Sequence, residues 1–247
     1  QYKRFFNPNE QEVSNYLKLI EKQEASVKKQ QLDELEKETI IESNENIVYK
    51  LNNTDHTAEI IESPKVSGDV FIPKYFEFKL QKYKIIRVSQ KAFANSLIKS
   101  LSFSLNSFVE SIGDCAFEQS QLQKLLIPNS LKKLDKYWNW CAFDLAQILI
   151  DPENKNFVDL NGVIYYTENS QLIEIIWASP YIKDQFIIPG SVTRIGCFSS
   201  NKCDKQKCVR SESKSLEINS CSFCYCKILE YIILFQLKKI VFMKCII

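Results

Sequence analysis

Glycine and histidine are both scarce in this chain, and their scarcity excludes several functional classes. Only 5 of the 247 residues are glycine, and no G-x-G-x-x-G or Walker-type segment is present. Loops that bind phosphate through backbone amides need such glycines, so these nucleotide-binding motifs are excluded. The single histidine, His56, lies in a polar, turn-like segment, and no motif pairs it with a Ser or Cys nucleophile. We therefore expect His56 at the surface, and a protein that is not an enzyme and uses no cofactor.

The chain also lacks an excess of charge of one sign and a long apolar run. Its 32 basic and 30 acidic residues give a formal net charge of +2, which favours neither nucleic acid nor anionic lipid as a partner. Residues 228–247 are the most apolar segment, yet Glu230, Gln236 and three lysines interrupt it. A bilayer span needs about 20 mostly apolar residues, so we expect buried strand there and no membrane span. The first residues carry no apolar signal-peptide core, although the chain does not begin with Met.

Residues 9–42 have the composition and spacing of a charged helix. Asn9 and Glu12 form a capping-box arrangement, and Val13, Leu17 and Ile20 recur on one helical face. Glu, Lys and Gln dominate the rest, and the heptad spacing is too irregular for a coiled coil. We assign residues 1–45 to an N-terminal charged helical segment that docks on the first unit of the following domain. Self-association through the helix is the alternative.

From about residue 46 the sequence changes to short β-type runs, with prolines at or beside their ends. A motif that closes on phenylalanine recurs along this region, at intervals of 24, 26, 55 and 25 residues. The interval of 55 residues is close to two units. A period in the twenties with apolar residues at fixed offsets indicates a solenoid. The recurring residues are Phe93, Phe117, Phe143, Phe198 and Phe223.

Each unit carries two apolar lines, which a single unit cannot bury. One is an L-x-x-L-x-L strand, as in residues 98–103, 122–127, 145–150 and 229–234. The other is V-x-x-I-G-x-x-A-F, as in residues 109–117, whose phenylalanine fills the space between successive coils. Stacked units share one continuous core. Besides the five phenylalanines, we expect this core to contain Ile112, Cys115, Cys141 and Cys221.

These motifs resemble the BspA-type leucine-rich repeat. The segments "LLIPNSLKKL", "FIIPGSVTRIG" and "SFVESIGDCAF" are similar to its L-x-x-I-x-I-P-x-S-V-x-x-I-G-x-x-A-F unit. Residues 150–166 resemble the β-hairpin that the family inserts between units, and Asn161-Gly162 is itself a hairpin-turn signal. Residues 57–73 are similar to the hairpin cap that precedes the first unit. The resemblance implies a mainly β leucine-rich repeat solenoid of BspA type, with a β-hairpin insertion and an N-terminal charged α-helix.

The resemblance also implies the organisation of the repeat domain, residues 46–247. It comprises a β-hairpin cap at 46–83, repeats at 84–150, the inserted hairpin at 151–180 and repeats at 181–247. Residues 195–215 depart from the pattern, because Cys197 replaces the alanine before Phe198 and a polar insertion follows. The last unit, 237–245, ends without a polar cap, so we expect the domain to be truncated there.

Nine cysteines leave more than one interpretation open. Cys203, Cys208, Cys221 and Cys224 have a spacing close to that of a four-thiolate zinc site, and disulfides within residues 203–226 are a further interpretation. Three cysteines instead stand two residues before a repeat phenylalanine, namely Cys115, Cys141 and Cys221. This shared position favours packing in the core, where cysteine behaves as a small apolar residue. We therefore expect no metal site.

The outward positions of the L-x-x-L-x-L strands are the candidate protein-binding surface. They are Ser102, Leu126, Leu149, Ile187 and Ile233. Four of the five are apolar, and we expect them to align as one stripe across adjacent coils unless the helix or the inserted hairpin covers them. The family resemblance implies a microbial surface antigen with an adhesion-type role, which binds a host or cell-surface protein. An intracellular, cytoplasmic scaffold is the alternative, favoured by the many cysteines and by the absence of a visible signal.

Overall fold

A computed structural model describes residues 10–182, 184–197, 199, 206–223, 226, 229, 231–234 and 237–240. The first element is α1, Glu10–Lys37, and β1, Glu38–Glu42, follows it directly. The helix therefore ends earlier than the expected residue 42. The reason is that Thr39, Ile40 and Ile41 form a β-branched run, and β1 pairs antiparallel with β2 along its whole length. Asn9, the expected N-cap, lies outside the described residues.

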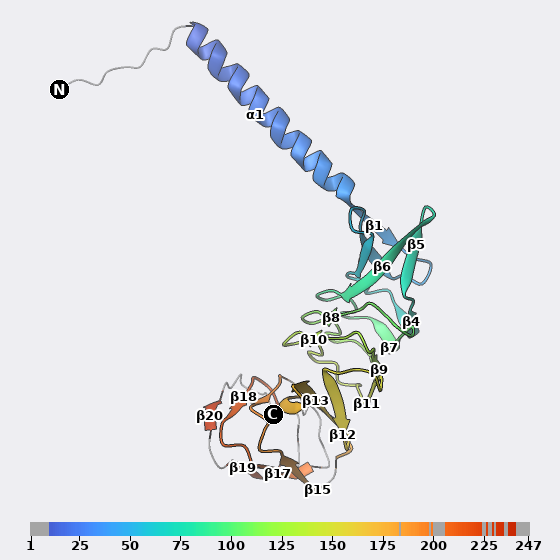
Figure 1. The fold of residues 1–247 in the computed structure, drawn as a ribbon, viewed down its shortest axis with the longest axis vertical. Helices are drawn as coiled ribbons and strands as arrows, with labels where there is room; N and C mark the ends of the chain where they lie inside the picture. Colours follow the sequence, from blue (N-terminus) through green and yellow to red (C-terminus); the bar gives the residue numbers. More distant parts are fainter. Residues whose placement is uncertain are drawn as a thin grey trace, which may run out of the picture.

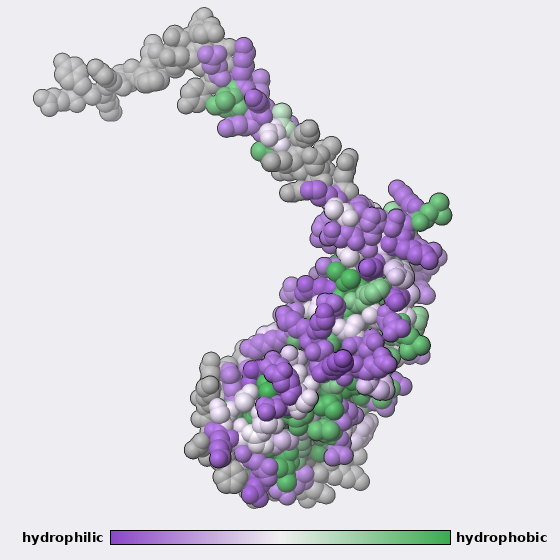
Figure 2. All heavy atoms as spheres, in the orientation of Figure 1, coloured by the Kyte–Doolittle hydropathy of each residue, from purple (hydrophilic) through white to green (hydrophobic). Residues whose placement is uncertain are grey.

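Helix α1 stands away from the coils instead of docking on them (Figure 1). Its described side chains, at residues 15, 17–28 and 37, are all exposed, including Leu17, Ile20 and Val27. Most of the coloured helix surface in Figure 2 is hydrophilic. The expected docking is therefore wrong for this part of the helix, because its apolar residues are too few to form a continuous apolar face.

The repeat domain begins with an antiparallel sheet that turns into a parallel one. β1, β2 (Val48–Asn52) and β3 (Thr57–Ile60) are antiparallel, whereas β3 pairs parallel with β6 (Gln81–Val88). β4 (Ser67–Ile72) pairs parallel with β7 of the next coil. The capping hairpin is thus β2–β3, and residues 61–73 already belong to the first coil. This differs from the expectation that residues 57–73 form the hairpin.

Two lines of parallel strands run through the N-terminal coils. One line is β3-β6-β8-β10 and the other is β4-β7-β9-β11. A separate hairpin, β5 (Tyr75–Phe78) with β6, projects from the first line (Figure 1). The remaining strands of these coils are β7 Leu97–Phe103, β8 Ser111–Ile112, β9 Lys124–Ile127, β10 Lys133–Leu134 and β11 Gln147–Ile150.

The inserted hairpin has three antiparallel strands: β12 (Phe157–Leu160), β13 (Val163–Glu168) and β14 (Gln171–Ala178). Asn161 and Gly162 join the first two strands with φ of 57° and 82°. Two consecutive positive φ values define the type I′ turn, so this turn signal is confirmed.

The hairpin separates two hydrophobic cores. One core fills the N-terminal coils and receives Phe157, Ile164 and Trp177 from the hairpin. The other fills the C-terminal coils and receives Val163, Tyr165 and Ile175. Alternate residues of a strand point to opposite faces, so the hairpin sheet is covered on both sides.

The C-terminal coils continue both lines of strands. β14 leads into β16, β18 and β20, while β15, β17 and β19 form the other line. Residues 206–211, in the segment that the sequence marks as a departure with a polar insertion, form β17, and Val209 of this strand is fully buried. The bounds are β15 Asp184–Ile188, β16 Arg194–Ile195, β17 Gln206–Ser211, β18 Leu216–Ile218, β19 Tyr231–Leu234 and β20 Leu237–Ile240. The mainly β solenoid with a hairpin insertion and an N-terminal helix is therefore confirmed.

An aromatic stack links the first coils. The rings of Phe93 and Phe117 lie 5.8 Å apart with an interplanar angle of 10°, and Trp138 meets Phe117 edge-on at 6.1 Å. Trp138 thus occupies the layer in which the sequence places Phe143, which is only partly buried. In the main chain Trp138 stands at the position of Ala116, since the N–H of Phe93 donates to the carbonyl of Ala116 at 2.8 Å and the N–H of Phe117 donates to that of Trp138 at 3.0 Å. The indole therefore reaches the aromatic layer from the alanine position of its unit. The larger indole buries more apolar area than a phenylalanine would. Phe198 lies outside the described residues, and Phe223 packs half-buried against the second core.

The glycine of the I-G pair has a packing role. A Cβ on Gly113 would lie 2.5 Å from the backbone nitrogen of Gln90, and one on Gly196 would lie 2.8 Å from the carbonyl oxygen of Ile175. Both glycines therefore allow one coil to approach the coil before it, which explains why this position carries glycine in two units.

Candidate protein-binding surface

A row of outward side chains crosses the sheet of β4, β7, β9 and β11. Phe71 lies opposite Ser102, and Leu126 lies opposite Leu149. Ser102 and Leu126 are half-buried, whereas Phe71 is 55% and Leu149 is 37% exposed. We call Phe71, Ser102, Leu126 and Leu149 the outer row. Phe71 was missed in the sequence, although it stands two residues before Pro73 as Leu126 does before Pro128.

The two remaining positions lie on a different sheet. Ile187 of β15 and Ile233 of β19 are 47% and 48% exposed, and both lie opposite Arg210 of the intervening β17. The five expected residues therefore do not form one stripe. The physical reason is twofold: the inserted hairpin ends the sheet at β11, and Arg210 places a cation between the two isoleucines.

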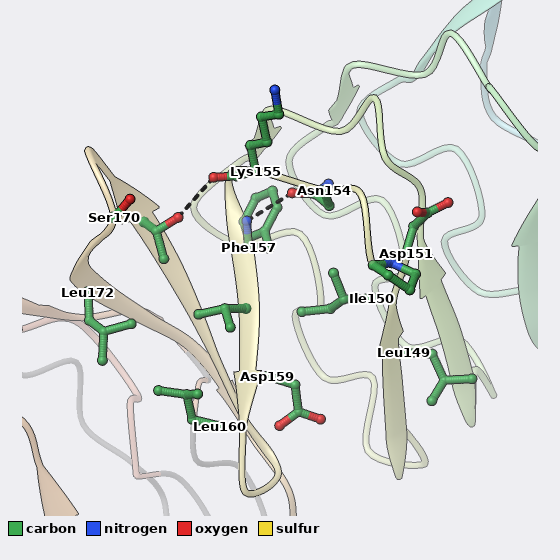
Figure 3. A pocket seen from close by; sticks show the side chains of 13 residues that line it. Leu149, Ile150, Asp151, Asn154, Lys155, Phe157, Asp159, Leu160, Ser170 and Leu172 are labelled. Atoms are coloured by element: carbon green, nitrogen blue, oxygen red, sulfur yellow. Dashed lines mark hydrogen bonds between the residues drawn. The ribbon is translucent and has the colours of Figure 1, made fainter.

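A groove of about 600 Å³ lies where the sheet of the outer row ends, between β11 and the inserted hairpin (Figure 3). Leu149 belongs to both the outer row and the groove. The apolar lining comes mainly from Ile150, Val158, Leu160 and Leu172. Figure 2 shows apolar patches among hydrophilic ones in the region of β9, β11 and β12.

Hydrogen bonds fix the loop between β11 and β12, which forms one end of the groove. The side-chain amide of Asn154 donates to the carbonyls of Pro128 and Leu131 at 2.6 and 3.1 Å, and so anchors the loop to the preceding coil. Its oxygen accepts the N–H groups of Asn156 and Phe157 at 2.8 and 2.9 Å. The groove is therefore bounded by an ordered loop and two strands.

The expected core cysteines share a backbone conformation more than a degree of burial. Cys115, Cys141 and Cys221 have φ of 52°, 54° and 55°, which places each in a left-handed turn position. Cys115 is buried, but Cys141 and Cys221 are only half-buried. Ile112, by contrast, is fully buried in the first core.

The zinc and disulfide interpretations involve cysteines of which the structure describes only some. Cys203 and Cys224 lie outside the described residues, so the four-thiolate set is not seen as a whole. Within the described part of the chain, no three His, Cys, Asp or Glu side chains are grouped so as to hold a metal. Burial raises the pKa of the Cys115 and Cys197 thiols to about 11, which holds both in the protonated form.

Two further expectations concern the surface and the membrane. His56 is exposed, in the turn between β2 and β3. The segment interpreted as buried strand instead of membrane helix contains β19 and β20. Within the described part of the chain, no helix combines the length and the apolar character that crossing a bilayer requires.

Comparison with known proteins places these coils in a family. The model of the BspA type leucine rich repeat region matches in 6 copies, over residues 74–175 and 179–246. No curated protein sequence matches the chain. Similar solved structures include a leucine-rich cell surface protein from Faecalibacterium prausnitzii, at 15% identity and a TM-score of 0.44, covering 80% of this chain and 76% of that one.

Two others are comparably distant. The pneumococcal vaccine antigen PcpA is 14% identical with a TM-score of 0.42, covering 82% of this chain and 77% of that one. A leucine-rich repeat protein from Eubacterium ventriosum is 12% identical with a TM-score of 0.47, covering 81% and 73%. Because the family model matches most of the sequence, and its matched residues contain the coils from β6 to β20, the chain belongs to the BspA-type leucine-rich repeat family.

Proposed function

We propose that this protein is a non-catalytic protein-binding module of the microbial cell surface, with an adhesion-type role toward a host or cell-surface protein. The observation that carries the proposal is the outer row. Phe71, Leu126 and Leu149 are apolar side chains on the solvent face of a sheet whose other face packs on the core. Apolar groups gathered in this way favour a protein interface over an ordinary solvated surface.

The geometry of the row suits recognition of another protein. Parallel strands place corresponding side chains about 4.8 Å apart, and each strand is held by the coil on either side of it or by the core beneath. Little conformational entropy is therefore lost on binding, because the strands are already ordered. Ile187 and Ile233 extend the candidate surface on the second sheet, with Arg210 between them.

The test replaces two apolar residues of the outer row with charged ones. Leu126→Asp combined with Leu149→Asp places two carboxylates in the interface, and we expect at least about a tenfold loss of binding to the cell-surface partner. Gln90→Asp, at an exposed turn residue on the other strand line, is the matched control. Far-ultraviolet circular dichroism checks that both variants fold. Undiminished binding by the double variant would remove the row from the interface.

Location is tested by labelling intact cells of the source organism with a membrane-impermeant amine reagent. Labelling without permeabilisation supports the surface role, and the bound protein can then be identified by photo-crosslinking from position 126. If the protein is expressed but is labelled only after permeabilisation, the surface role is wrong.

An intracellular scaffold is the second candidate, and the cysteines favour it. Cys115, Cys141, Cys197 and Cys208 are free thiols in the structure. Proteins of reducing compartments keep their cysteines in this form, whereas exported proteins often pair them. The same labelling experiment decides between the two candidates, since a scaffold inside the cell would be captured only from lysed cells together with its cytosolic partner.

A further inference from the structure

The last strand of the outer-row sheet, β11, has a backbone edge that nothing pairs within the described residues. The N–H groups of Gln147 and Asp151 donate to the carbonyls of Gln123 and Ile127, at 3.1 and 2.9 Å. Alternate residues of a parallel strand therefore face β9. The residues between them, Ile148 and Ile150, direct their N–H and C=O groups to the opposite edge. Within the described residues β11 pairs with β9 alone, so these groups lie on the side of β11 that borders the groove. Ile150 lines the groove, whereas Ile148 is only 3% exposed and does not line it.

The groove has a second strand edge on its other side. In the described part of the chain β12 pairs with β13 alone, and Leu160 lies opposite Val163 across the two-residue turn. Hydrogen-bonded pairs alternate along an antiparallel ladder, so Phe157 and Asp159 direct their backbone groups away from β13. The N–H of Phe157 is taken by Asn154, whereas no hydrogen bond occupies the N–H or C=O of Asp159 within the described residues.

The inserted hairpin explains why these edges are open. In the coils before it, each strand of this line is covered by the strand of the next coil. After β11 the chain turns into β12 instead, and the line resumes only in the separate sheet of β15, β17 and β19. An unpaired strand edge is a template for a further strand.

The side chains that line the groove indicate which residue types such a strand would carry. Apolar lining from Ile150, Val158 and Leu160 favours apolar residues at alternate positions. Asp151 and Asp159 also line the groove, against one lysine, Lys155, and neither aspartate takes part in an ion pair within the described chain. In Figure 3 Ile150 lies between the two strands and Asp159 points from β12 toward β11. Each aspartate bonds a backbone N–H through one oxygen, at 2.9 and 2.8 Å, which leaves the other oxygen for a cation.

We propose that an extended segment of a partner protein, with alternating apolar residues and a lysine or arginine, binds this groove by adding a strand to the open edge of β11. The inference rests on the proposed protein-binding function and names the chemistry of the partner. Backbone hydrogen bonds to the N–H and C=O of Ile150 supply affinity that is independent of sequence. Side chains at alternate positions, together with the aspartates, select the segment.

The first test uses a peptide of known strand geometry. The probe is the capped peptide LQKLLIP, the sequence of residues 122–128, because this segment contains β9, which already pairs with β11 on its closed edge and carries one lysine. The control is the same peptide with alternate backbone nitrogens methylated, which removes donors and keeps the side chains. We expect saturable binding of the probe by fluorescence anisotropy and at least about a tenfold weaker binding of the methylated control. Equal binding of the two peptides, or no binding of the probe at millimolar concentration, overturns the proposal.

Variants of the protein then locate the site. Ile150→Pro removes a donor that makes no internal bond, and proline is tolerated at a strand edge; we expect at least about a tenfold loss of probe binding, while Ile150→Val binds as the wild type does. Asp159→Asn keeps the oxygen that accepts the Gly162 N–H, so we expect only a two- to five-fold loss, about that of one exposed ion pair. This loss should vanish with a probe whose lysine is replaced by glutamine.

Hydrogen exchange followed by NMR tests the edge itself. In the free protein the amide of Ile150 should exchange faster than that of Leu149, and the probe should slow it. A protected amide at Ile150 in the free protein would show that the edge is already occupied, and a change in oligomeric state on Ile150→Pro would make a second copy the occupant. Either result overturns the proposal. If the natural partner's binding is lost in the outer-row double variant but not in Ile150→Pro, the proposed function stands and this inference falls. The reverse result removes the outer row and retains the groove.

Discussion

Ile164 and Tyr165 are consecutive residues of β13 that are buried in different hydrophobic cores. Ile164 packs with the N-terminal coils and is fully buried, whereas Tyr165 packs with the C-terminal coils and is 2% exposed. The inserted hairpin is therefore a shared wall between the two halves of the solenoid. This position makes its two faces separately testable.

Truncation of either residue should affect mainly the half that it faces. We expect Ile164→Ala and Tyr165→Ala each to lower the free energy of unfolding by about 2–5 kcal/mol, since both leave a cavity in a closed core. Hydrogen exchange should accelerate first in β9 and β11 for Ile164→Ala, and first in β16 and β18 for Tyr165→Ala. Acceleration of the same coils by both variants would contradict the two-core arrangement.

The aromatic stack predicts unequal effects at two phenylalanines that share a sequence motif. Phe117 is fully buried between Phe93 and Trp138, and we expect Phe117→Ala to cost about 3–5 kcal/mol in urea unfolding. Phe143 is only partly buried, so Phe143→Ala should cost less than half as much. Equal losses of unfolding free energy in the two variants would contradict this prediction and would place Phe143 in the stacked layer, as the sequence predicts.

Two glycines with different surroundings provide a matched pair. Gly113→Ala forces a Cβ against the backbone of Gln90, which has no freedom to move away, and we expect a loss of about 2 kcal/mol or more. The nearest atom to a Cβ at Gly190 is 3.4 Å away, so Gly190→Ala should change stability by no more than about 0.5 kcal/mol. Thermal unfolding measures both, and similar melting temperatures for the two variants would refute the close approach.

The turn between β5 and β6 is built from unfavourable residues. Lys79 and Leu80 have φ of 48° and 66°, and the Leu80 side chain is fully exposed. A left-handed conformation costs an L-residue with a Cβ about 1–2 kcal/mol, a cost that glycine and asparagine reduce. We therefore expect Lys79→Asn combined with Leu80→Gly to raise the free energy of unfolding by about 1–2 kcal/mol. The opposite change at the other turn, Asn161→Lys, should lower it.

The buried thiols predict a dependence on alkaline pH. Burial raises the pKa of Cys115 and Cys197 from 9.0 to about 11 in the folded protein. The folded state therefore retains these protons when the unfolded state has lost them. The resulting contribution to stability is complete below pH 9 and is lost between pH 9 and 11. Urea midpoints across this range should fall, and less so in a Cys115→Ser, Cys197→Ser variant, while both thiols in the native wild type should react slowly with iodoacetamide at pH 8.

Several features of the molecule were accessible from the sequence because they depend on local periodicity. Alternation along residues 122–127 places Leu125 and Ile127 inside and Leu126 outside, as the structure has them. The Asn161-Gly162 turn follows from the backbone freedom of those two residues alone. Such signals depend only on residues that are close in sequence, so they can be recognised without knowledge of the fold.

Other features were not accessible, because they depend on competition between segments. Residues 38–42 continue the helical charge pattern, yet β-strand pairing with residues 48–52 removes them from the helix. Trp138 and Phe143 both suit the aromatic layer, and only the path of the third coil decides between them. Leu126 and Ile187 have the same motif position, but the sheet order places them on separate sheets.

The sequence by itself determined the repeat unit and which residues of each strand face the core, since both follow from spacing along the chain. Its motifs also carry the resemblance to the family that the family model shows. Tertiary structure alone decided that the hairpin divides two cores, that the outer row ends at β11 and that, among the described residues, no strand pairs with the edge beside it. The physical reason is that side-chain alternation depends on one strand, whereas an unpaired edge depends on whether another segment packs beside that strand.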